Sequence, residues 1–215
     1  MGQKRMPREV RERQMLDAAV VAFARHGYQA ASMDDIAEAA GVSKPLVYLY
    51  LKSKEDLFMA CVRREVGALV AAVREGTRER ELTADQQLWR GLTAFFAHTA
   101  ARPDGVAVLY RARTQGEPFA REVAAMRVEI VTIVTALLGQ AAQDAGCGEL
   151  AEREVSGLAH ALVGAAESLA EWANSRSCAS ADSSSAKDTA ATLMNFCWAG
   201  LENLMTGRPW MAPGH

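Results

Sequence analysis

Residues 32–54 read SMDDIAEAAGVSKPLVYLYLKSK, and this stretch decides the fold of the N-terminal part of the chain. Two helices that cross at a steep angle with almost no linker need small side chains at the crossing, and Ala37 and Ala40 supply them. Gly41 tolerates the positive φ of a tight turn, and Val42 follows it as an apolar plug. The pattern predicts a helix-turn-helix.

The second helix of this pair is predicted to carry an apolar face that points away from the core. Ser43 is expected to cap its first turn. Val47 and Leu51 lie four residues apart and set the inner face, so Pro45 and Leu49 must point outward. An outward apolar face is unusual in water, but it suits a DNA major groove, where alkyl groups contact thymine methyls.

The rest of the chain is also predicted to be helical, because strand signals are nearly absent and apolar residues recur at spacings of three and four. The expected fold is all-α, with an N-terminal three-helix DNA-binding domain and a larger C-terminal helical domain. A serine-rich stretch over residues 175–185 reads as a flexible loop. The expected helices span residues 7–27, 32–41, 43–51, 53–80, 83–103, 104–115, 118–142, 149–174 and 187–205.

Charge is distributed unevenly along the 215 residues, although the net charge is only −2. Residues 1–54 hold nine basic and six acidic side chains, whereas the remainder of the chain is net acidic. A basic head on an acidic body is what a DNA-binding module on a non-DNA-binding domain requires. No apolar run is long enough to span a membrane, and the N-terminus lacks the apolar segment of a secretory signal, so a cytoplasmic location is expected.

An enzyme is not expected. The sequence contains no G-x-S-x-G, H-E-x-x-H or P-loop motif, and its histidines are scattered singly. The segment Gly146, Gly148 and Ala151 imitates a dinucleotide fingerprint, but no strand precedes it, so it reads as a loop between helices. No cofactor or metal site is expected, and four widely spaced cysteines read as buried reduced thiols: Cys61, Cys147, Cys178 and Cys197.

The string GVSKPLVYLYLKSKEDLF at residues 41–58 resembles the signature of the TetR family of bacterial regulators, as do FARHGY at 23–28 and ASMDDIA at 31–37. The resemblance implies that residues 1–53 bind double-stranded operator DNA and that residues 54–215 bind an effector and form a homodimer. Leu46 and Leu49 depart from the family pattern, where threonine and an aromatic residue are usual, and these departures bear on the operator sequence. The predicted DNA-binding residues are Ser32, Ser43, Lys44, Pro45, Leu46, Tyr48, Leu49, Tyr50 and Lys54.

The C-terminal domain is predicted to hold a small hydrophobic effector, with a solid core as the alternative. Tyr110, Arg111 or Arg113 would supply the polar contact for a carboxylate or thioester head. The predicted ligand-binding residues are Leu92, Phe95, Phe96, Leu109, Met126, Ile130 and Ile133. The predicted dimer-interface residues are Leu162, Leu169, Trp172, Leu193, Phe196, Leu201 and Leu204, with burial inside one chain as the alternative.

The stretches AESLAEWA (166–173) and FCWAGLENL (196–204) resemble actinobacterial TetR-like regulators of lipid metabolism, some of which respond to long acyl chains. The predicted function is a repressor that a small hydrophobic effector, such as a fatty acyl compound, releases from a palindromic operator. The alternative is a ligand-independent architectural DNA-binding protein. Such a protein would share the same head, so only the C-terminal domain distinguishes the two.

Overall fold

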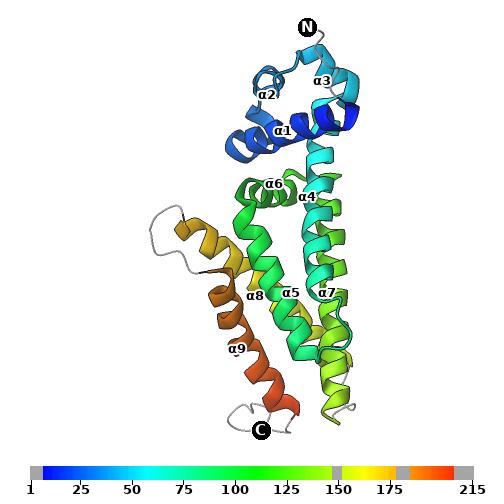
Figure 1. Cartoon of the computed structure of the whole chain (residues 1–215), viewed down its shortest axis with the longest axis vertical. Coiled ribbons are helices and arrows are strands. Elements are labelled where there is room, and N and C mark those ends of the chain that lie inside the picture. Colours follow the sequence, from blue (N-terminus) through cyan, green and yellow to red (C-terminus); the bar gives the residue numbers. More distant parts are fainter. Residues whose placement is uncertain (1–6, 147–151, 178–184, 206–215) are drawn as a thin grey trace. The chain divides into compact units, whose positions relative to one another are not determined.

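The structure is a computed structural model of the chain, and it describes residues 7–146, 152–177 and 185–205. Regular structure in these ranges is entirely α-helical, as predicted (Figure 1). The helices are α1 (Arg8–Ala30), α2 (Met33–Ala39), α3 (Lys44–Leu51), α4 (Lys54–Gly76), α5 (Ala84–Ala101), α6 (Pro103–Gln115), α7 (Phe119–Asp144), α8 (Glu152–Ser177) and α9 (Ala186–Met205).

The ends of α1 and α4 differ from the predicted ones. The predicted stop at Gly27 is a real break (φ 77°, ψ 170°), but one more helical turn follows and α1 continues to Ala30. Helix α4 ends at Gly76 rather than near Arg80. A side chain at Gly76 would lie 2.8 Å from the carbonyl oxygen of Arg90, so α5 approaches the end of α4 closely.

The serine-rich loop prediction falls mostly outside the described residues. Helix α8 runs through Ser177, three residues farther than predicted, and Ser185 precedes α9. Residues 178–184 lie outside the described ranges, as do Cys147, Cys178, Gly148 and Ala151.

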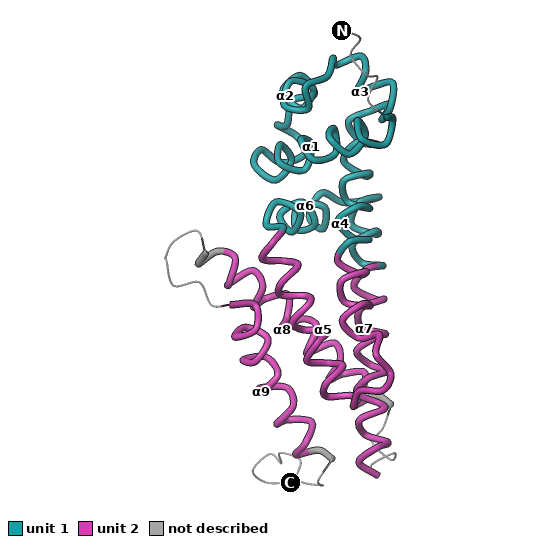
Figure 2. The backbone as a smooth tube through the Cα atoms, viewed as in Figure 1, with its two compact units in different colours: residues 1–68, 102–125 teal, residues 69–101, 126–215 magenta. Residues whose placement is uncertain are grey.

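The chain forms two compact units, and each contains segments distant in sequence (Figure 2). The first comprises residues 1–68 and 102–125, and so contains α1, α2, α3, the first part of α4, α6 and the start of α7. Its core includes a cluster of aromatic rings. Phe58 packs edge-on against Phe23 and Phe119, with ring centroids 4.9 and 4.8 Å away, and Tyr28 lies 5.1 Å from Phe58.

Arginine side chains attach α6 to the rest of the first unit. The Arg111 guanidinium donates from Nε and Nη2 to the carbonyl oxygen of Ala24, at 3.2 and 2.8 Å. These bonds attach α6 to the backbone of α1 just before its break at Gly27. Arg111 was a predicted contact for an effector head group, and the structure instead uses it to hold α1.

Glu65 of α4 carries a buried carboxylate, which contacts Arg102 just before the start of α6. The Glu65 side chain is 2% exposed and accepts two hydrogen bonds from Arg102, at 2.9 and 2.8 Å, and one from Arg64 at 3.1 Å. Arg64 also pairs with Asp17 of α1 at 2.7 Å. Burial alone raises the pKa of Glu65, but the hydrogen bonds from Arg102 and the charges of Arg102 and Arg64 outweigh it, so the pKa lies below its ordinary value. The cluster joins α1, α4 and α6.

The second unit comprises residues 69–101 and 126–215, of which the described part contains the remainder of α4 and α7 together with α5, α8 and α9. Helix α5 packs on both α8 and α9, and its Leu88 and Phe96 are buried. Arg127 of α7 pairs with Glu167 of α8 at 3.3 Å. Across the described ranges, no helix combines the length and apolarity needed to cross a lipid bilayer. The predicted boundary at residue 53 separates a DNA-binding part from an effector-binding and dimerisation part. The two compact units do not test this division, so it stays a prediction.

Candidate nucleic-acid interface

Backbone hydrogen bonds fix the crossing of α2 and α3. The N–H of Val42 donates to the carbonyl oxygen of Ala37 at 3.0 Å, and that of Gly41 donates to Glu38 at 2.9 Å. Gly41 adopts φ 65°, the left-handed conformation that the sequence predicted. Ala37 is buried at the crossing. The turn is therefore short and rigid, and it holds α3 at a defined angle to α2.

The two faces of α3 divide as predicted. Val47 is fully buried and Leu51 is 8% exposed, so both face the core. Leu49 is 75% exposed and Tyr48 39% exposed, and Pro45 is exposed as well. Exposing a leucine and a tyrosine together on an eight-residue helix is costly in water unless a partner covers them.

Lys44 begins α3 and forms an ion pair with the preceding helix. Its Nζ donates to Oδ2 of Asp34 in the first turn of α2, at 2.9 Å. This hydrogen bond and the Asp34 charge raise the pKa of Lys44 above its ordinary value. Both side chains are substantially exposed, so the pair lies on the surface beside the outer face of α3.

The serines that precede α2 and α3 differ in their hydrogen bonds. Ser32 precedes α2, and its Oγ accepts from the backbone N–H groups of Asp34 and Asp35, at 3.1 and 3.4 Å. Ser43 occupies the N-cap position of α3, but its hydroxyl makes no capping hydrogen bond, so that part of the prediction is wrong. The cause is local, because Pro45 has no N–H and the N–H of Leu46 donates to the Ser43 carbonyl oxygen at 2.9 Å.

The remaining predicted DNA contacts lie near the ends of α3. Tyr50 is half-buried with the Arg8 guanidinium 5.2 Å from its ring centroid, which brings the start of α1 beside the end of α3. Lys54 begins α4, donates to the carbonyl oxygen of Gln29 at 2.9 Å, and lies over the Tyr28 ring. Leu46 is half-buried. The predicted DNA-binding residues thus all fall in the first unit, on or beside the helix-turn-helix.

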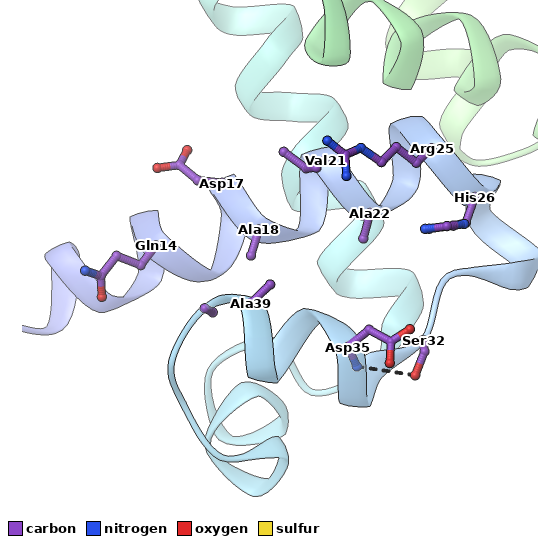
Figure 3. A pocket seen from close by; sticks show the side chains of 11 residues that line it. Gln14, Asp17, Ala18, Val21, Ala22, Arg25, His26, Ser32, Asp35 and Ala39 are labelled. Carbon is purple, nitrogen blue, oxygen red and sulfur yellow. Dashed lines mark hydrogen bonds between the residues drawn. The ribbon is translucent and has the colours of Figure 1, made fainter.

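Sequence reasoning missed a groove between α1 and α2. Its volume is about 530 Å³, and in Figure 3 Ala18 and Ala22 of α1 and Ala39 of α2 lie between the two helices. None of its lining residues comes from α3. No local pattern could have identified it, because it depends on how two helices with small side chains pack.

The predicted effector residues are apolar and mostly buried, but they belong to different units. Leu109 lies in the first unit, whereas the other six lie in the second. Ile133 is half-buried, and the others are buried. The rings of Phe95 and Phe96 are in edge-on contact at 5.2 Å.

The predicted dimer-interface residues divide into core and surface. Leu162, Leu193 and Leu201 are at most 3% exposed within a single chain, so they pack in its own core and are unavailable to a partner. Phe196 is 76% exposed and Trp172 48% exposed. Leu169 is half-buried, and the side chain of Leu204 lies outside the described residues.

The cysteine prediction holds for Cys61, which is buried, whereas Cys197 is half-buried. Burial raises the pKa of the Cys61 thiol to about 12. In the ranges that the structure describes, no three histidine, cysteine or acidic side chains gather in a way that could hold a metal ion.

A trihelical head with a tight helix-turn-helix, joined to a larger all-helical body, defines a helix-turn-helix DNA-binding protein. The family model described as bacterial regulatory proteins, tetR family, matches residues 15–61. The model described as the tetracyclin repressor-like C-terminal domain matches residues 84–200. The chain belongs to the TetR family of transcriptional regulators, which are not enzymes.

Individual proteins similar to this chain are also transcriptional regulators. The chain is 32% identical over 204 residues to the HTH-type transcriptional activator FasR of Mycolicibacterium smegmatis, covering 93% of this chain and 87% of FasR. A TetR-like transcriptional regulator from Rhodococcus sp. RHA1 is 33% identical, with a TM-score of 0.78, covering 92% of this chain and 99% of that one. FadR from Bacillus subtilis in complex with stearoyl-CoA shares the fold at 20% identity, with a TM-score of 0.64 over 86% of this chain and 98% of FadR.

Proposed function

We propose that the chain binds a roughly two-fold symmetric operator as a homodimer, with α3 in the major groove. The exposed Tyr48 and Leu49 on a helix anchored by Val47 carry this proposal. In a major groove, Leu49 and Pro45 would pack against base edges and thymine methyls, and the Tyr48 hydroxyl would reach a phosphate.

Cations frame this apolar face and would position it on the duplex. Lys44 lies at the start of α3, and Lys54 follows its end. Phosphate contacts release condensed counterions, so binding should weaken as the salt concentration rises. Ser32 and Ser43 would add hydroxyl contacts from the two helix starts, and Tyr50 would contribute from the end of α3.

The operator is tested by selecting bound sequences from random duplex DNA with the full-length protein. A symmetric site with half-sites about 10 base pairs apart is expected. Tyr48→Phe and Leu49→Ala should bind the selected site more weakly. The control is Val128→Ala, which removes a side chain that is 66% exposed in the second unit, and it should bind normally. Equal affinity of all four proteins for the site would refute this use of α3.

The dimer is proposed to form through α8 and α9, with Phe196 as the main contact. An aromatic side chain 76% exposed on an apolar helix is typical of a covered surface, and Trp172 on α8 adds a second large ring. Phe196→Glu should sediment as a monomer and bind the full operator weakly. Val128→Glu places the same charge on an apolar site of α7 that is 66% exposed, and it should remain dimeric. If Phe196→Glu also remains dimeric, the interface lies elsewhere.

The effector is proposed to be a long-chain fatty acyl compound bound by the body of the protein, residues 54–215. FasR is similar to this chain along nearly its whole length, and the FadR fold accommodates stearoyl-CoA. The buried apolar side chains of α5 and α7, including Phe95 and Met126, would contact the acyl chain.

The effector proposal is tested by measuring operator affinity in the presence of acyl-CoAs of increasing chain length. A bound effector should lower the affinity about 5- to 150-fold, and operator DNA should weaken effector binding by the same factor. Phe95→Trp and Met126→Trp should fill the site and abolish the response while the protein stays folded. If no chain length has an effect and both variants are destabilised, this region is a solid core.

The regulator is proposed to repress, with the effector releasing it from DNA in the cytoplasm. FasR is named an activator, so the direction needs a direct measurement. Transcription in vitro from a promoter that carries the selected operator should fall when the protein is added and recover with acyl-CoA. A rise in transcripts would make the protein an activator, and no effect of acyl-CoA would favour an architectural role.

A further inference from the structure

Asp34 and Lys44 form a surface ion pair between the two helices of the helix-turn-helix. Their 2.9 Å contact joins the first turn of α2 to the first residue of α3, and the side chains are 69% and 44% exposed. An exposed ion pair contributes little to stability, so its position beside the proposed DNA-reading face is the feature that matters.

Hydrogen bonds fix the backbone that carries each partner, and the ion pair itself holds the two side chains together. The N–H of Asp34 donates to the Ser32 hydroxyl at 3.1 Å, which fixes the first turn of α2. The Val42 to Ala37 bond at 3.0 Å fixes the turn that leads to Lys44. The carboxylate and the ammonium are therefore presented together rather than as two independent side chains.

The pair presents a hydrogen-bond acceptor and a donor side by side. In the major groove, guanine offers O6 and N7 as acceptors, and its cytosine partner offers the N4 amine as a donor. Guanine O6 and cytosine N4 are themselves hydrogen-bonded, at about 2.9 Å. The Lys44 ammonium can donate to guanine while the Asp34 carboxylate accepts from the adjoining cytosine. An adenine–thymine pair instead places its amine between two acceptors, beside the thymine methyl.

We propose that Asp34 and Lys44 together read one G·C base pair in each half-site of the operator. This proposal rests on the DNA-binding role proposed above, and it assigns Asp34 a direct contact with a base. The Lys44 charge also reduces the repulsion between the Asp34 carboxylate and the DNA phosphates.

The test measures the affinities of full-length variants for the selected operator and for operators with each base pair replaced symmetrically in both half-sites. The variants are Asp34→Ala, Lys44→Met and the control Asp35→Ala. Asp35 is an exposed neighbour on the same helix, and its replacement changes the charge by the same amount. Asp34→Ala preserves the Ser32 cap, which uses only the backbone of residue 34.

The wild type and Asp35→Ala should prefer G·C over A·T at one position of each half-site by about 5- to 150-fold, the usual range for a good base contact. Asp34→Ala and Lys44→Met should lose most of this preference at that position alone. Asp35→Ala should strengthen binding to all sequences alike, since it removes a negative charge, and Asp34→Ala should show the same gain at every position except the one whose preference it loses.

Two results would overturn the base-reading role while leaving the DNA-binding proposal intact. One is an Asp34→Ala profile that matches that of Asp35→Ala at every position, which would make Asp34 only a source of repulsion. The other is a preference for A·T at the position that Asp34→Ala affects. A wild-type protein that shows no preference at any position would instead refute the proposed function itself.

Discussion

Replacing Arg102 with methionine should destabilise the protein by about 2 to 3 kcal/mol, because it leaves the buried Glu65 carboxylate with too few partners. Glu65 is 2% exposed, and Arg102 supplies two of its hydrogen bonds, at 2.9 and 2.8 Å. Methionine retains the apolar stem of arginine, so the change removes chiefly the charge and the hydrogen bonds.

The magnitude follows from the geometry of the cluster. Removing one partner of a fully buried ion pair costs about 3 to 5 kcal/mol. Here the Arg102 side chain is 41% exposed, and Arg64 remains 3.1 Å from the carboxylate, so water and the second arginine recover part of the loss. The expected cost is therefore below that range.

Urea unfolding followed by circular dichroism measures the change. The matched control is Arg63→Met, which breaks a pair with Glu122 in the same unit at 2.9 Å. That pair is exposed, so its loss should cost less than about 1 kcal/mol. The double variant Glu65→Leu with Arg102→Met should be more stable than Arg102→Met alone, because no uncompensated charge remains. If Arg102→Met costs no more than Arg63→Met, the cluster does not hold Glu65 as described.

Three further outcomes are expected. Because the folded pKa of Glu65 is lowered, its stabilising contribution is present above the unfolded pKa of about 4.3 and is lost as the pH falls through the folded pKa. In Glu65→Gln, the free energy of unfolding should therefore change less on acidification than in the wild type. An unchanged dependence on acidic pH would contradict this. Gly105→Ala should lower the free energy of unfolding in urea by about 1 to 3 kcal/mol, because its new Cβ would lie 2.9 Å from the Glu65 carboxyl carbon. The control Gly139→Ala meets no atom within 4 Å and should stabilise α7 by about 0.5 to 1 kcal/mol. Equal effects of the two variants would refute the close approach at Gly105. Cys61, with its pKa near 12, should resist iodoacetamide in the folded protein at pH 8 while the half-buried Cys197 reacts, as peptide mass spectrometry would show, and equal native rates would contradict the burial.

The helix-turn-helix was predictable because its determinants are local. Gly41, the alanines at the crossing, and the four-residue spacing of Val47 and Leu51 lie within a short stretch, and each has one strong conformational consequence. The outward direction of Leu49 followed from the same spacing. The Ser43 cap failed because two local signals compete there, and the proline removes a donor that a capping hydroxyl would use.

The contacts that attach α6 were beyond sequence reasoning because they join distant residues. Arg111 meets a carbonyl 87 residues earlier, and Arg102 meets a carboxylate 37 residues earlier. An arginine on an amphipathic helix carries no sign of such a partner. The helix pattern likewise could not separate Leu201 from Phe196, because burial within one chain and burial between two chains leave the same apolar spacing.

The central claim is that the first unit reads a DNA sequence through the exposed face of α3. The measurement that tests it most directly is the ratio of affinities of the full-length protein for its selected operator and for a scrambled duplex of the same composition, at one physiological salt concentration. A ratio of at least about 10³ is expected, the lower end for specific regulators, with a marked fall for Leu49→Ala. A ratio near one, unchanged by Leu49→Ala, would contradict it.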